Sequence, residues 1–387
     1  MRTTGKTLAA AVAGALVALA VVAMPYVRTT AFLLDLAGVE GGVRGWIPIA
    51  PVPFASRDLD VPTRHGPISV RAYDPAVPNP PTVVVFPGVH GGGVDAPRLT
   101  RLCGRLSTSG LRVVCAPLPD LRQFILTGRS TDVIEDVASW VSQQADLSPT
   151  GRVTLVGVSF AGGLAVVAAG RDALRDRLSA VVSIGGHGDL RRTLTFLTTG
   201  TLPDGSLRAP HDYPLAVIAL TLTPRLVPAE QVPMTEDAMR TFLAASLDDG
   251  TGFEHGMPII ARLRDDVPAM PEPARTLVRA IVERDVVTTG RLLAPFIDAL
   301  ANDPSMSPSL APAPDAPVFL LHGADDNVIP STETVLLAED LEQRGRGRVR
   351  TLLTPLLTHA HLSTAAEPAE LWALVDFWRD VRRTVER

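Results

Sequence analysis

Short continuous apolar runs recur along the chain and alternate with segments whose apolar residues follow helical spacing. In Thr131–Gln144, for example, Val133, Val137 and Trp140 fall on one face of a helix. A continuous apolar run is typical of a strand that is buried on both faces of a sheet. The strands predicted in this way are Thr82–Phe86, Val153–Val156, Leu178–Ile184 and Val318–Leu321, and further strands are expected at Leu111–Ala116 and Val349–Leu353. Strands that alternate with helices predict the α/β class, with a mostly parallel sheet covered by helices on both faces.

This alternation begins near residue 57 and is interrupted once. Residues 57–61 and 68–73 alternate apolar and polar positions, as strands with one exposed face do. Residues 190–310 contain helical segments and many prolines, but no run typical of a buried strand. We therefore expect residues 57–189 and 311–387 to form the α/β core. The intervening segment is expected to form a helical cap over the carboxyl ends of the strands.

The amino-terminal stretch has a different character. Two basic residues precede an uncharged run, Thr7–Val27, that consists mostly of Ala, Val and Leu. That length suffices to cross a bilayer as one helix, and a basic head before an apolar run also describes a secretory signal peptide. The run continues past a small-residue cleavage site at Ala18-Leu-Ala20, which favours an uncleaved single-pass anchor at residues 1–27 over a signal. Residues 28–56, rich in Gly and Pro, predict a linker.

The anchor predicts the location of the protein. Basic residues tend to stay on the cytoplasmic side of a membrane span, so the large domain is expected on the extracytoplasmic face of the cell membrane. A cleaved signal would instead make the protein secreted.

Composition narrows the class of partner. The 387 residues are 46% hydrophobic and carry a formal net charge of −5, and no basic patch predicts binding to nucleic acid. The two cysteines, Cys103 and Cys115, could pair in an exported domain or lie buried as small apolar residues. No spacing of Cys, His, Asp or Glu predicts a metal site, and no cofactor is expected.

A serine follows one of the predicted strands at an abrupt turn. The sequence Gly157-Val-Ser159-Phe-Ala-Gly162 joins the strand Val153–Val156 to a run of helical character. Small neighbours let the strand and the helix approach closely, and the turn forces the serine backbone into a sparsely populated conformation. Ser159 is therefore the candidate nucleophile. The alternative is a glycine-rich turn of a nucleotide-binding fold, but no Gly-x-Gly-x-x-Gly or Lys-Ser/Thr signature accompanies it.

A serine hydroxyl needs a base, and the base needs an acid to orient it. Two carboxylates, Asp325 and Asp326, follow the strand Val318–Leu321. Two histidines, His359 and His361, follow the next predicted strand. In an open α/β sheet the carboxyl ends of the strands form the usual site, so these groups are expected to meet there.

The order Ser, acid, His, each beyond a strand, resembles the catalytic triad of the α/β-hydrolase superfamily. The resemblance covers residue 57 to the carboxyl terminus except for the cap, and is strongest to esterase-like and dienelactone-hydrolase-like members. The tip His322-Gly-x-x-Asp-x-Val-Ile-Pro330 is similar to the loop that carries the acid. By that pattern Asp326 is the acid and Asp325 the alternative; a minority of members carry the acid where Asp189 lies here. His359 follows its strand sooner and is favoured as the base, with His361 as the alternative.

The same resemblance implies an oxyanion hole made of two backbone amides. One donor is the amide of Phe160, directly after the nucleophile. If His90-Gly-Gly-Gly93 acts as a lipase-type motif, the second donor is Gly91 or Gly92. If the Pro-Gly pair before it occupies the place of the family's His-Gly, the second donor is Val89, which lies at the expected distance from the strand end. The elbow itself departs from Gly-x-Ser-x-Gly by an alanine, which is still small.

Together these features predict a serine hydrolase that cleaves carboxylic esters through an acyl-enzyme. The alternatives are an acyltransferase or peptidase that uses the same triad, and a non-catalytic, membrane-tethered binding protein of the same fold. The expected substrate is a small-molecule ester. An anchored enzyme with an apolar cap suggests a lipophilic one.

Overall fold

The computed structural model describes residues 21–39, 41–246, 256–357 and 367–386. Its centre is a single eight-stranded sheet with the order β1-β2-β4-β3-β5-β6-β7-β8. The strands are β1 (Phe54–Val61), β2 (Ile68–Pro75), β3 (Thr82–Phe86), β4 (Arg112–Cys115), β5 (Val153–Val158), β6 (Leu178–Ile184), β7 (Val318–Gly323) and β8 (Val349–Thr354). β2 runs antiparallel to β1 and β4, and every other neighbouring pair is parallel.

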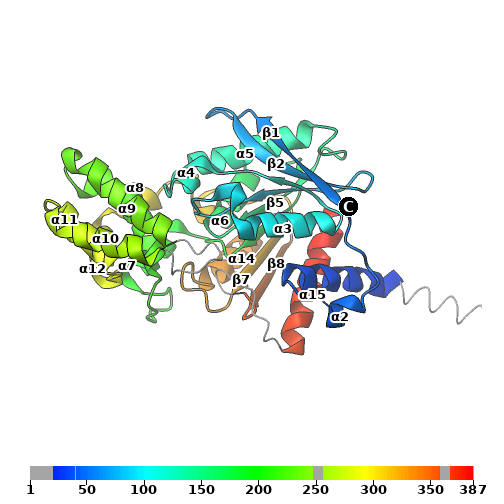
Figure 1. Ribbon diagram of the computed structural model, residues 1–387. Coiled ribbons are helices and arrows are strands. Elements are labelled where there is room, and N and C mark those ends of the chain that lie inside the picture. Colours follow the sequence, from blue (N-terminus) through cyan, green and yellow to red (C-terminus); the bar gives the residue numbers. More distant parts are fainter. Residues whose placement is uncertain (1–20, 40, 247–255, 358–366, 387) are drawn as a thin grey trace, which may run out of the picture.

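Helices cover both faces of this sheet, as the alternation in the sequence predicts. Successive residues of a strand point to opposite faces, so Val84 joins one core cluster while Val83 and Val85 join the other. The first cluster includes α4 (Pro119–Arg122), α5 (Arg129–Gln143), α6 (Phe160–Ala169) and α14 (Thr332–Arg344). The second includes α3 (Pro97–Thr108), α15 (Pro368–Val385) and a helix over residues 21–36. Figure 1 shows α15 and the helix over residues 21–36 below the sheet.

The segment between β6 and β7 forms a helical lobe to one side of the sheet (Figure 1, left). Its α-helices are α7 (Leu190–Thr199), α8 (Asp212–Leu226), α9 (Val232–Ala245), α10 (Met257–Asp266), α11 (Ala274–Val282), α12 (Val286–Leu293) and α13 (Asp298–Ala301). Ile218, Phe242 and Ile281 are buried between these helices and belong to the same cluster as the first face of the sheet. The lobe therefore packs onto the core through continuous apolar contact.

Part of the expected linker at residues 28–56 is helical and packed on the core. The predicted anchor, Thr7–Val27, lies mostly outside the described residues, and its described part, residues 21–27, is helical and continuous with residues 28–36. Thr29, Ala31 and Phe32 are buried, so residues 28–36 are docked on the core, although residues 28–56 are predicted as linker. Across the described ranges, no helix has both the length and the apolar character needed to span a membrane.

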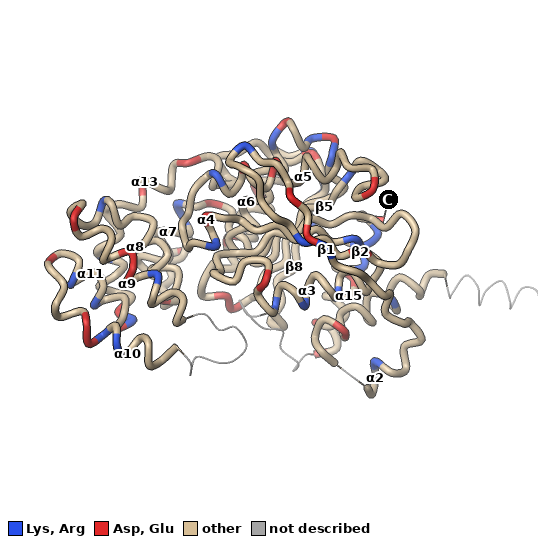
Figure 2. The backbone as a smooth tube through the Cα atoms, turned by 45° about the horizontal axis from the view of Figure 1, so that its top comes forward, with Lys and Arg blue, Asp and Glu red and all other residues tan. Residues whose placement is uncertain are grey.

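The two cysteines lie on adjacent elements, α3 and β4. Both thiols are buried and free. A hydrogen bond with Cys115, together with burial, raises the pKa of the Cys103 thiol well above its usual value, so Cys103 is protonated at neutral pH. In the view of Figure 2, basic and acidic residues are interspersed along both the sheet core and the helical lobe.

Candidate active site

Ser159 stands on a strained turn between β5 and α6. Its backbone has φ 55° and ψ −133°, a conformation that costs a non-glycine residue about 1–3 kcal/mol. The surrounding structure holds the turn in place, because the Ser159 amide donates to the Ile184 carbonyl at 2.7 Å. The Ser159 carbonyl accepts from the Gly162 amide, also at 2.7 Å. The side chain is only half-buried, so the predicted elbow presents its hydroxyl at the carboxyl edge of the sheet.

The small residues around the serine are required by close backbone packing. A Cβ at Gly157 would lie 2.2 Å from the Ala161 carbonyl oxygen, and one at Gly162 would lie 2.5 Å from Ser183 Oγ. Ala161 itself is fully buried. The methyl group at this position, which departs from the usual elbow pattern, is thus accommodated within the core.

The loop after β3 lies directly beside the serine. A Cβ at Gly88 would lie 2.8 Å from Ser159 Cβ and 3.4 Å from Ser159 Oγ, so only glycine allows this approach. Val89 follows at once. Within the glycine string that follows, His90 Nδ1 accepts from the Gly92 amide at 3.0 Å, and the Gly91 carbonyl accepts from Arg122 Nε at 3.3 Å.

Of the two carboxylates after β7, Asp326 is buried and Asp325 is exposed. Asp326 Oδ1 accepts from the amides of Val328 and Ile329, at 2.8 and 3.0 Å, which fixes the plane of the carboxylate. Its Oδ2 lies close to Gly185, just after β6, where a Cβ would be 3.8 Å away. The buried acid therefore faces the strand that separates β7 from the serine strand.

His322 shapes this loop. Its Nε2 donates to the Ile329 carbonyl at 2.9 Å, and its Nδ1 lies 2.6 Å from the Thr334 hydroxyl. A carbonyl can only accept, so Nε2 carries the proton. Both nitrogens of this fully buried ring are thus used to hold the turn that presents Asp326.

The two candidate bases, His359 and His361, lie outside the described residues. The structure does place the start of their loop. β8 pairs in parallel with β7, with Thr354 opposite Gly323, so the loop leaves the same edge of the sheet as the acid loop. The topology of the sheet therefore brings the serine turn, the acid loop and the beginning of the histidine loop to one edge. It does not distinguish His359 from His361 as the base.

Asp189, the remaining acid candidate, has a structural role. It caps α7 by accepting from the Arg192 amide at 2.8 Å, and it accepts from Ser309 Oγ at 2.5 Å. The nearby buried Glu333 accepts from the Asp189 amide at 2.7 Å and from Arg192 Nε at 2.9 Å. These contacts tie the start of the cap to α14.

The cap also contacts both loops of the site through residues that no sequence pattern singles out. The Tyr213 hydroxyl, at the start of α8, donates to the Val89 carbonyl at 3.3 Å. Burial raises the pKa of Tyr213 well above its usual range, so it stays a neutral donor. On the other side, the His211 amide donates to the Asn327 carbonyl at 3.0 Å, and Arg208 donates to the Asp326 carbonyl at 3.4 Å.

The buried His187 packs against the residue that follows Ser159. Its ring stacks on Phe160 with centroids 4.6 Å apart, and its Nε2 donates to the Met306 carbonyl at 2.7 Å. The ring is fully buried, and within the described chain its Nδ1 has no hydrogen-bond partner. Gly163 makes room for the ring, since a Cβ there would lie 2.5 Å from it.

Burial lowers the pKa of His187 from 6.5 to about 4. Between these two values the unfolded chain binds a proton that the folded chain does not, so stability falls as the pH falls through this window. The expected loss is about 1.4 kcal/mol per pH unit and about 3 kcal/mol in total. Chemical denaturation at pH 7 and pH 5 should show that the free energy of unfolding decreases less for His187→Gln than for the wild type. Equal acid losses in the two proteins would contradict this expectation.

Comparison with known proteins identifies the class. Residues 81–352, more than half of the chain, match the model of the alpha/beta hydrolase fold family. The protein therefore belongs to the α/β-hydrolase family, as the resemblance in its sequence implies. No curated protein matches the chain.

Solved structures with a similar fold include several hydrolases. An esterase from Pyrobaculum calidifontis is 18% identical, with a TM-score of 0.48 over 94% of this chain and 92% of that one. Carboxyl esterase 2 from Tuber melanosporum is 14% identical, with a TM-score of 0.49 over 86% of each chain. An acylaminoacyl peptidase from Pyrococcus horikoshii is 13% identical, with a TM-score of 0.49 over 90% of this chain and 44% of that one. The family membership stated above rests on the family match.

Proposed function

We propose that this protein is a serine hydrolase that cleaves carboxylic esters through Ser159. The observation that carries the proposal is the strained turn at Ser159, with φ 55°, beside the close backbone of Gly88. A turn that costs stability persists where the surrounding structure enforces it, and such strain concentrates at functional sites. Here the turn places a half-buried hydroxyl at the amino terminus of α6. The first turn of α6 contains no acidic residue that would offset the positive end of the helix dipole.

The proposed reaction uses groups from each loop at this edge. The Ser159 hydroxyl attacks the ester carbonyl while His359 accepts its proton, and Asp326 holds and stabilises the imidazolium. The negative charge on the carbonyl oxygen is stabilised by the amides of Phe160 and Val89. Collapse expels the alcohol, which takes the proton from His359. Water, activated by the same histidine, then attacks the acyl-enzyme and releases the carboxylic acid.

The contacts described above support the choice of partners. Asp326 is buried and held by two amides, whereas Asp325 is exposed. Val89 follows Gly88, which packs against Ser159, whereas the Gly92 amide already donates to His90 Nδ1. For the base, His359 is preferred because it follows β8 sooner, and His361 is the alternative.

We further propose that the apolar run at residues 7–27 attaches the enzyme to the cell membrane, with the core on the extracytoplasmic side. Attachment to a bilayer would bring the site close to lipophilic esters, which is the substrate class we favour. Flotation of the full chain with lipid vesicles tests the attachment separately from the chemistry.

Labelling with a fluorophosphonate tests the hydrolase proposal. This probe forms a covalent bond with an activated serine, so the wild-type chain should be labelled at Ser159 and the Ser159→Ala variant should not. Mass spectrometry of the labelled peptide identifies the site. Ser183, which is buried behind the elbow, serves as the internal control and should remain unlabelled. Absence of label from the folded wild type would overturn the proposal.

A further inference from the structure

The helix at residues 21–36 is held against α15 by the aromatic side chain of Tyr26. The Tyr26 ring stacks on Trp372, with centroids 5.1 Å apart and planes 7° apart. The Arg379 guanidinium lies over the same ring, 4.5 Å from its centroid, and donates to the Tyr26 hydroxyl. Trp372 and Arg379 are two turns apart on one face of α15, so Tyr26 is inserted between them.

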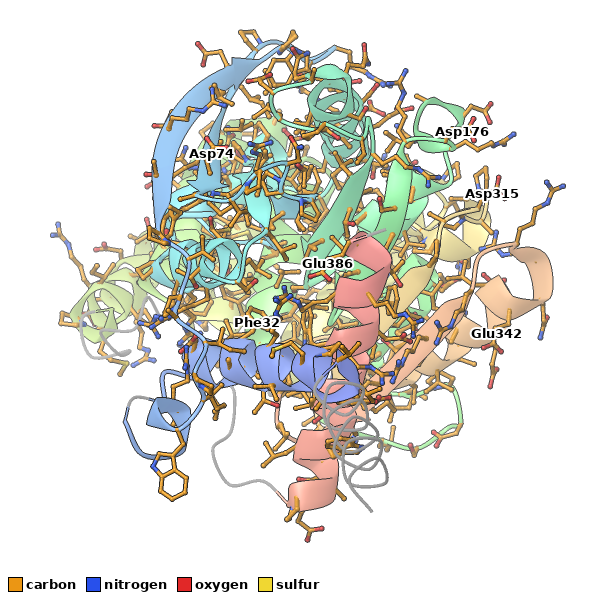
Figure 3. All side chains as sticks on the ribbon, turned by 90° about the vertical axis from the view of Figure 1, so that its right-hand side faces the viewer. Phe32, Asp74, Asp176, Asp315, Glu342 and Glu386 are labelled. Carbon is orange, nitrogen blue, oxygen red and sulfur yellow. The ribbon has the colours of Figure 1, made fainter. Side chains whose placement is uncertain are left out.

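A second contact fixes the direction of the helix. Phe32 is buried and meets Trp378 edge to face, with centroids 5.7 Å apart. Figure 3 shows this helix in pale blue, with Phe32 labelled, lying across α15 rather than along it. Two aromatic contacts, separated by about 9 Å along the helix, hold its direction relative to the core.

Apolar side chains at this junction remain exposed to solvent. On the helix they are Val21, Val22 and Met24, with exposed fractions of 67%, 66% and 43%. At the start of α15 they are Leu371 and Trp372, with 49% and 59%. Because Trp372 stacks on Tyr26, one turn beyond Val22, the two groups adjoin. We call these five residues the apolar collar. Contiguous exposed apolar surface of this kind marks an interaction site.

The chain itself indicates what covers the collar. Residues 7–20 contain no charge, and they directly precede the helical residues that bear the collar. Trp and Tyr concentrate at the boundary between the lipid chains and water. We propose that the collar lies in the interfacial layer of the bilayer, so that α15 touches the membrane as a second contact beside the anchor. This inference rests on the membrane attachment proposed above.

Charges near the collar define the kind of surface that it fits. The exposed Arg28 lies one turn beyond Met24, while Glu367 and Glu370 form the capping box of α15 beside Leu371. Both signs are present, so the contact is apolar and aromatic and requires no anionic lipid. Since the helix is wedged onto α15, the catalytic domain is held in one orientation to the membrane.

Quenching by brominated lipid tests the contact in the full chain. The protein has four tryptophans, of which Trp378 is 6% exposed. In a Trp46→Phe, Trp140→Phe background, Trp372 is therefore the exposed tryptophan. After reconstitution into phosphatidylcholine vesicles, lipid brominated near the interface should quench its emission. Adding Trp372→Phe should remove that quenching, while activity toward a water-soluble ester is retained and shows that the chain is folded.

The other outcomes separate the proposals. Vesicles that carry the protein but leave Trp372 unquenched would overturn the collar contact and leave the attachment standing. The same result with chemical cross-linking between copies would assign the collar to a dimer. A chain that does not float with vesicles would overturn both the attachment and the collar. Fluorophosphonate labelling of Ser159 reports on the hydrolase independently of all of these.

Discussion

Replacing Ser159 with alanine is expected to lower kcat for short p-nitrophenyl esters on the order of 10⁶-fold, as loss of the nucleophile does in Ser-His-Asp triad enzymes. The reason is that, among the described residues, the hydroxyl that meets the loop at Gly88 is that of Ser159. Residual turnover should reflect binding and the two oxyanion amides alone. Steady-state kinetics on the purified variant measures the effect, with protein folding checked by circular dichroism.

The same position offers a control on stability. Alanine keeps the backbone cost of φ 55°, so Ser159→Ala should unfold close to the wild type. Glycine adopts this conformation without strain, so Ser159→Gly should be more stable by about 1 kcal/mol or more, and equally inactive. Denaturant titration of the three proteins gives the comparison. Full activity of either variant would show that hydrolysis does not proceed through this serine.

The elbow is predictable from sequence because its requirements are local. Gly157 and Gly162 meet backbone or side-chain atoms within van der Waals distance, and any larger residue would clash. A short stretch of letters therefore records the geometry. The alternation of apolar runs and helices is similarly direct, since the inner strands β3, β5 and β7 are buried on both faces.

Other features depend on contacts between residues far apart in the chain. Tyr213 donates to a carbonyl 124 positions earlier, and Arg208 to one 118 positions later. No periodicity or motif marks such pairs. The docking of residues 28–36 escaped prediction for the same reason. The Gly- and Pro-rich stretch after it suggests a linker, while its helix is stabilised through Tyr26, whose partner Arg379 lies 353 positions away.

The identity of the acid can be decided by a matched pair of variants. Asp326→Asn is expected to lower kcat about 10⁴-fold, whereas Asp325→Asn should stay within a few-fold of wild type. Both changes remove one negative charge from adjacent positions, but only Asp326 is buried at the site. Activity on short p-nitrophenyl esters and the rate of fluorophosphonate labelling should fall together in the Asp326 variant.

The geometry of the loop gives the reason why asparagine is not expected to replace Asp326 in this role. The amides of Val328 and Ile329 both require an acceptor at the Oδ1 position of Asp326. An asparagine must keep its oxygen there, which preserves the fold of the loop but places its NH₂ group where Oδ2 stands. A donor at that position cannot accept the imidazole N–H, and it favours the wrong histidine tautomer. A folded, active Asp326→Asn variant beside an inactive Asp325→Asn variant would therefore reverse the assignment.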